Sequence, residues 1–143
     1  MSFIIKSDTI TKFELQNRTK AFYIGVIKLC EHFPKNAAGF ETAKQLIRSG
    51  GSVGANYRAA CRGKSKADFI YKIEIVLEEA DESLYWLEVT KSAELIKSNQ
   101  SDQLDCLIKE ANELVSIFTA TDMTAKRNRD QPNPKITKSQ NQK

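Results

Sequence analysis

The sequence is poor in the residues that break helices and in those that build covalent or metal sites. Of 143 residues, three are proline, one is histidine and three are cysteine, and the cysteines form no CxxC pair. An odd number of widely spaced cysteines argues against a disulfide framework and against a zinc site. We therefore expect reduced core thiols in a cytoplasmic protein, with no metal and no cofactor. No apolar run approaches the ~20 residues that span a bilayer, so we expect no membrane contact.

The prolines stand at 34, 132 and 134, which leaves almost one hundred residues free to form long helices. Apolar residues recur at helical intervals in four stretches, and no stretch shows a comparable strand pattern. These stretches predict helices over residues 9–33, 38–62, 65–96 and 101–125. Four amphipathic helices with short polar connections predict an all-α protein, an antiparallel up-down four-helix bundle that occupies residues 1–125.

The third predicted helix has the clearest pattern, since six apolar residues follow heptad spacing: Ile70, Ile73, Leu77, Ala80, Leu84 and Leu87. Ser65 lies three residues before Asp68 and Thr11 three before Glu14, the spacing of helix-capping signals. After residue 125 the chain is rich in Asn, Gln, Pro and Lys and has one aliphatic residue, Ile136. Such a segment buries too little apolar surface to become ordered, so we predict a disordered basic tail over 126–143.

Charge is segregated along the chain, although the net charge is only +4. Residues 35–72 carry eight basic and two acidic side chains, whereas residues 73–122 carry three basic and twelve acidic ones. Residues 126–143 add six basic side chains and one acidic one. The polarity therefore lies between helices, with a basic second helix and an acidic third.

The basic residues of the second helix and of the turn after it form the candidate nucleic-acid-binding set: Lys44, Arg48, Arg58, Arg62, Lys64 and Lys66. At about 100° per residue, the four on the helix fall within an arc of about 80°. Gly51 and Ala55 lie in the middle of that arc, where small residues would let a polyanion approach the backbone. A plainer interpretation stays open, in which these side chains are solvated or paired with carboxylates of the third helix.

Two other patterns have structural interpretations. Ser49–Gly54 lacks the Gly-Lys-Ser/Thr ending of a phosphate-binding loop and follows no strand, so we expect its glycines to let another helix pack closely. The acidic face of the third helix, with Glu74, Glu78, Asp81 and Glu88, is interpreted as a solvated or intersubunit face. No nucleophile and base occur in a recognisable arrangement, so we expect no catalytic residues and no enzyme.

The middle of the chain resembles a known family. The similarity is carried by Phe33–Lys35, by Gln45–Arg62 with its Ser-Val-Gly-Ala-Asn core, by Lys66–Ile70 and by Glu78–Glu88. These segments resemble the 23S rRNA intervening-sequence protein family, which is similar to the accessory proteins of diversity-generating retroelements. The resemblance implies four-helix bundles that assemble into homopentameric rings, and relatives that bind nucleic acid and a reverse transcriptase through basic surfaces.

Two functions follow as expectations. The first is a non-enzymatic, oligomeric four-helix bundle that binds RNA or DNA through its basic surface, with the tail adding nonspecific attraction. The alternative is a protein-interaction scaffold, or an accessory subunit for a nucleic-acid enzyme such as a reverse transcriptase. The expected partners are therefore further copies of the chain, RNA or DNA, and a nucleic-acid-processing protein.

Overall fold

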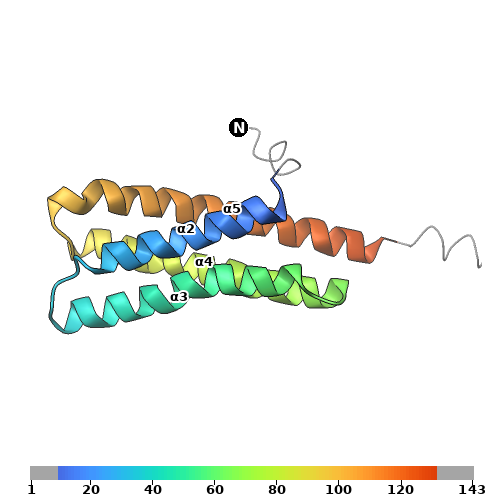
Figure 1. Ribbon diagram of the computed structural model, residues 1–143, viewed down its shortest axis with the longest axis horizontal. Helices are drawn as coiled ribbons and strands as arrows, with labels where there is room; N and C mark the ends of the chain where they lie inside the picture. The colour runs from blue at the N-terminus through green and yellow to red at the C-terminus, as the bar shows by residue number, and fades with distance from the viewer. Residues whose placement is uncertain (1–9, 132–143) are drawn as a thin grey trace, which may run out of the picture.

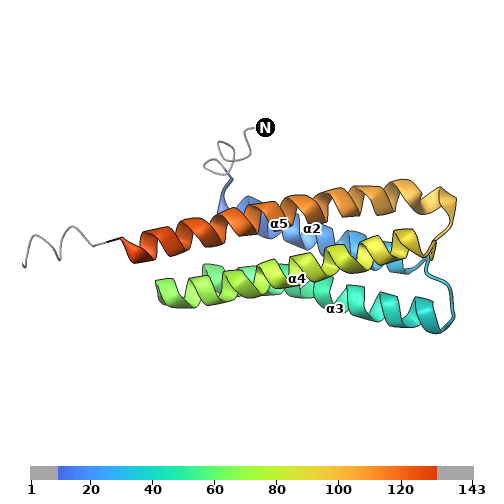
Figure 2. The same ribbon diagram turned by 180° about the vertical axis from the view of Figure 1, so that it is seen from behind.

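The computed structural model describes residues 10–131, which form an antiparallel four-helix bundle (Figure 1). The helices are α2 (Lys12–Cys30), α3 (Ala37–Cys61), α4 (Lys66–Ser92) and α5 (Ser101–Asp130), with a short 3₁₀ helix, η1 (Ser98–Gln100), before the last. Consecutive helices run in opposite directions, as Figures 1 and 2 both show. Each helix packs on its neighbours in sequence, and α5 closes the bundle against α2.

α2 and α4 begin at residues whose side chains cap the helix. The Glu14 backbone N–H donates to the Thr11 hydroxyl at 3.0 Å, and the Glu14 carboxylate accepts from the Thr11 N–H at 3.2 Å. Ser65 accepts from the Asp68 N–H at 3.1 Å and starts α4 in the same way. Each cap satisfies a backbone donor that the first helical turn leaves unpaired. Both predicted capping signals are confirmed.

The helix boundaries differ from the prediction in three of the helices. α2 begins at Lys12 rather than at residue 9, because Thr11 is its cap, and it ends at Cys30 rather than at residue 33. α4 ends at Ser92 rather than at residue 96, because Glu94 has a φ of 53°, a left-handed conformation that stops an α-helix. α5 continues through Asp130, so residues 126–130 are helical and do not belong to the predicted tail. The rest of that tail, residues 132–143, lies outside the described residues.

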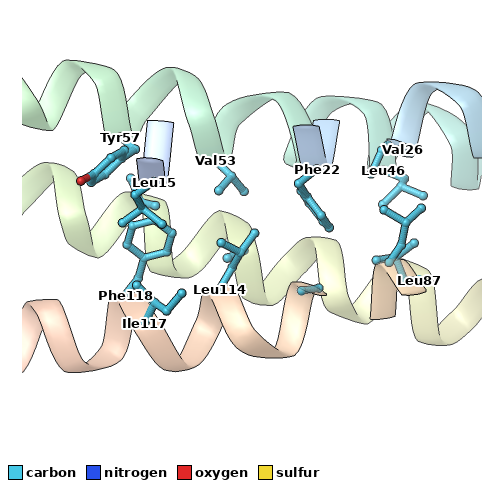
Figure 3. Close-up of a cluster of buried hydrophobic side chains, with 14 of the residues drawn as sticks. Leu15, Phe22, Val26, Leu46, Val53, Tyr57, Leu87, Leu114, Ile117 and Phe118 are labelled. Carbon is cyan, nitrogen blue, oxygen red and sulfur yellow. The ribbon is translucent and has the colours of Figure 1, made fainter. Parts of the chain in front are cut away.

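The core runs along the axis between the four helices, and Figure 3 shows its side chains meeting from all of them. Phe118 of α5 is completely buried and packs on Tyr57 of α3, with ring centroids 5.4 Å apart. Burial of large apolar side chains is the main favourable term in folding. This shared core makes the described chain one folding unit.

The buried face of α4 differs from the predicted heptad seam. Ser83 is fully buried, whereas Leu77 and Leu84 are only half-buried. The reason is the contact with α3, where the Ser83 hydroxyl donates to the Ser49 hydroxyl at 3.1 Å. A pair of small polar residues satisfies its own hydrogen bond and lets α3 and α4 approach.

We expect Phe118→Ala to lower the free energy of unfolding by about 3–5 kcal/mol, because it removes a buried ring and leaves a cavity. The matched control is Phe40→Ala, since Phe40 is 63% exposed. It should change the free energy by no more than about 0.5 kcal/mol. Urea denaturation followed by circular dichroism measures both. Equal losses in the two variants would contradict this core.

Candidate nucleic-acid interface

The glycines of α3 lie against α2. A Cβ added to Gly54 would come within 3.1 Å of the Thr19 hydroxyl, and one added to Gly51 would come within 3.0 Å of the Tyr23 ring. Side chains at these positions would therefore push the two helices apart. The predicted packing role of the glycines is confirmed, and the helix that they admit is α2. Gly51 faces an aromatic ring, so it does not offer the open backbone that the sequence analysis expected.

The close approach leaves a shallow groove of about 420 Å³ on the outside of the α2–α3 contact. Its lining residues come from both helices: Gln16, Asn17, Thr19, Lys20, Tyr23, Gly51, Gly54, Ala55 and Arg58. None of the nine is acidic, and Lys20 and Arg58 supply two cations. We call this the α2–α3 groove.

Lys20 was not among the predicted binding residues, because all six of those belong to the second helix and the turn after it. Arg58, which lines the other side of the groove, is about six helical turns from the start of α3 and 38 positions along the chain from Lys20. Only the antiparallel pairing of α2 with α3 brings the two together. The one signal in the sequence was the spacing of Asn17 and Lys20, three residues apart on the outer face of α2.

Five of the six predicted binding residues are exposed and make no ion pair with residues 10–131: Lys44, Arg58, Arg62, Lys64 and Lys66. The structure extends this set around the end of the bundle, because Arg62 ends α3 and Lys66 begins α4. Lys64 lies in the turn between them. Apart from Arg48, the predicted cations therefore face solvent from α3 and the following turn.

Arg48 is the exception, because carboxylates of α4 hold its guanidinium. Nη1 donates to Glu79 Oε2 at 3.0 Å, and Nη2 donates to Glu82 Oε2, which also accepts from the Trp86 indole N–H at 3.0 Å. These bonds raise the pKa of Arg48, and its guanidinium lowers the pKa of Glu82. Arg48 thus joins α3 to α4, and its charge is compensated within the chain. The alternative interpretation of the basic residues, in which they pair with carboxylates of the third helix, is therefore confirmed for Arg48.

The acidic residues predicted on the third helix lie on the outer side of α4. Glu78, Asp81 and Glu88 are exposed and make no ion pair within the described chain. Glu74 pairs with Lys126 of α5, which also contacts Asp122 at 3.0 Å. The bundle therefore has a basic side over α2 and α3 and an acidic side on α4.

Two further features concern metal binding and membrane insertion. Among residues 10–131, no three His, Cys, Asp or Glu side chains gather in a way that could hold a metal ion. No helix of the described chain is both long and apolar enough to cross a membrane.

Cys30 and Cys61 are half-buried, and burial raises the pKa of Cys30 to about 11. Cys106 is exposed, so its predicted place in the core is wrong.

The fold and the charge pattern define an all-α, up-down four-helix bundle with one basic side. The sequence profile of the 23S rRNA-intervening sequence protein family matches residues 11–117, and the chain belongs to that family. The resemblance noted in the sequence is thereby confirmed.

A solved relative has the same fold. It is a crystal structure at 1.70 Å of a protein from the S23 ribosomal protein family of Bacteroides thetaiotaomicron, described as having unknown function. The two chains are 31% identical, with a TM-score of 0.67, over 75% of this chain and 96% of the relative. No curated protein matches the chain.

Acidification should weaken the Arg48 contact. Because Arg48 holds the pKa of Glu82 below its ordinary value of 4.5, the contact stabilises the fold above that pH. This stabilising contribution is lost as the pH falls through the lowered pKa that Glu82 has in the folded protein. When the pH falls from about 5 to about 3, the free energy of unfolding should therefore decrease less for Arg48→Met than for the wild type. Urea titrations at each pH measure this, and the difference should be about 1 kcal/mol or less for so exposed a pair.

Arg62→Met is the matched control, since Arg62 makes no ion pair within residues 10–131. It should follow the pH dependence of the wild type. If Arg48→Met showed the same acid sensitivity as the wild type, the carboxylates of α4 would not be linked to Arg48 as described.

Proposed function

We propose that the protein binds nucleic acid, RNA or DNA, without catalysing a reaction, and that the polyanion lies along the basic side formed by α2 and α3. The observation that carries the proposal is the α2–α3 groove, where Lys20 and Arg58 line a hollow surface with no carboxylate. Unpaired cations facing solvent attract phosphates and release their counterions on contact.

The length of the basic surface suits a short stretch of nucleic acid. Lys44 and Arg62 are 18 residues apart on one helix, which corresponds to about 27 Å. Along the axis of a B-form duplex, that distance corresponds to about eight base pairs at about 3.4 Å each. Arg58 and Arg62 supply planar guanidinium groups that can hold a phosphate through two N–H donors. The proposed contact residues are Lys20, Lys44, Arg58, Arg62, Lys64 and Lys66, without Arg48.

We also propose that the chain assembles with further copies of itself, as a homopentameric ring of the kind that the family resemblance implies, and that it works in the cytoplasm. Exposed aromatic side chains support self-association, because such groups are enriched at protein interfaces. Tyr71 and Tyr85 on α4 are 62% and 56% exposed. Free thiols on all three cysteines agree with a reducing compartment.

A second candidate function is that of a protein-interaction scaffold, or of an accessory subunit for a nucleic-acid enzyme such as a reverse transcriptase. The acidic side of α4 favours it, because Glu78, Asp81 and Glu88 lie on the same stripe of the helix as the exposed rings of Tyr71 and Tyr85. Such a surface suits a basic protein partner. In this case the cations of α3 would join subunits, and another component would contact the nucleic acid.

Replacing Arg58 and Arg62 tests the first function. Arg58→Ala/Arg62→Ala should weaken binding to a structured RNA about 30-fold at 0.1 M salt, because two phosphate contacts are lost. The slope of log affinity against log salt should become shallower by about 1.5. Lys20→Ala alone should cost about fivefold. Fluorescence anisotropy over a range of salt concentrations measures these values.

Two control variants also remove basic side chains: the first removes two and the second removes one. Lys97→Ala/Lys109→Ala also removes two exposed cations, but from the loop before η1 and from α5, and should leave the affinity within about twofold. Arg48→Ala should likewise bind normally. Unchanged binding by the Arg58/Arg62 variant would refute the nucleic-acid site. Loss of assembly by that variant, seen by light scattering with binding retained, would instead support the scaffold.

A further inference from the structure

One end of the bundle has three helices where the other has four. α2 begins at Lys12, and its first buried residue, Leu15, belongs to the same buried core as Ile117 and Phe118 of α5 (Figure 3). α5 continues for 12 residues beyond Phe118, to Asp130. Figures 1 and 2 show that this last part of α5 extends past the start of α2, alongside the α3–α4 end. Within residues 10–131, no helix lies opposite it on the α2 side.

Two adjoining cavities, of about 320 and 370 Å³, occupy this end of the bundle. They share Phe69, Ala125 and Asn128, and together they form what we call the open-end groove. Phe69 stands at helical spacing from the fully buried Ile73 and Val76, so it is on the inward face of α4. It is nevertheless only half-buried, because α2 does not reach it.

The groove follows the line of α2. Ile117, Thr121, Thr124 and Asn128 line it at intervals of four, three and four residues, which places them on one stripe of α5. The stripe starts at Ile117, which belongs to the same buried core as Leu15 near the start of α2. Ile10 is half-buried and packs against the core just before α2 begins. The chain ahead of Ile10 therefore starts at the edge of the open-end groove.

We propose that residues 1–9 of the same chain occupy the open-end groove, with Phe3, Ile4 and Ile5 in contact with Phe69 and Ala125. The segment is long enough, since nine residues reach about 30 Å when extended. The groove from Ile117 to Asn128 spans 11 residues of helix, or about 17 Å. The segment has three consecutive large apolar side chains. These can cover the exposed apolar surface of Phe69 and Ala125, which are both half-buried.

The C-terminal residues 132–143 fit the groove less well. They follow Gln131, at the outer end of α5, so they would have to reverse direction to enter the groove. They have one aliphatic residue and three lysines, which would meet Lys64 and Lys66 on the rim. Like charges disfavour that contact. In residues 1–9, by contrast, the charges of Lys6 and Asp8 cancel.

A cysteine probe in the groove tests the proposal in the full chain. Thr124→Cys places a thiol at an exposed groove position, and its rate of alkylation is read by peptide mass spectrometry, which separates it from the three native cysteines. Adding Phe3→Ser/Ile4→Ser/Ile5→Ser should speed its alkylation about tenfold, because a covered thiol reacts only when the covering segment opens. The matched change Ile136→Ser should leave the rate unchanged.

Ser116→Cys, which lines a separate pocket of α5 together with Lys109 and Asn112, is the reference site, and its rate should not respond to either set of changes. Equal acceleration at both probe sites, no acceleration at Thr124→Cys, or release by Ile136→Ser would each overturn the proposal. Pairing Ile4→Cys with Thr124→Cys identifies the occupant. A disulfide within one chain is expected, whereas one that joins two chains would assign the groove to a second copy.

Discussion

The contact between α2 and α3 is the interaction on which the proposed function depends. Gly51 and Gly54 have no side chains to hold α2 away, so Tyr23 and Thr19 reach the surface of α3. That closeness sets Lys20 beside Arg58 and leaves a groove between the helices rather than a ridge of side chains. Each glycine costs about 1 kcal/mol of helix stability relative to alanine, and close packing offsets this cost.

The distribution of charge gives the bundle two different sides. Arg48 marks the boundary, because Glu79 and Glu82 bind its guanidinium across the α3–α4 contact. On the α2 side of that boundary the cations face solvent, and beyond it lie the carboxylates of α4. A polyanion would therefore be attracted to the α2–α3 surface and repelled from α4. A protein partner or a further copy of the chain could still use the acidic side.

Periodicity predicted the four helices, and the capping spacing at Ser65 predicted where α4 begins. The capping spacing at Thr11 is also confirmed, although the helix was predicted to begin at residue 9. Local rules could not show that α5 extends to Asp130, because the composition of residues 126–130 resembles that of a tail while Lys126 forms ion pairs with Glu74 and Asp122. The ion pairs of Arg48 and the position of Lys20 in the α2–α3 groove could not be predicted from the residue pattern of a single helix either. Both depend on which faces meet, which is a property of the whole bundle.

Photo-crosslinking of bound RNA, with the modified peptides identified by mass spectrometry, tests the central claim most directly, because it locates the nucleic acid on the bundle without altering any charge. The account predicts crosslinks to peptides of α2 and α3 that contain Lys20, Tyr23 and Arg58. It predicts none to the outer face of α4. Crosslinks confined to α4 or to the N-terminal half of α5, with α2 and α3 unmodified, would contradict it.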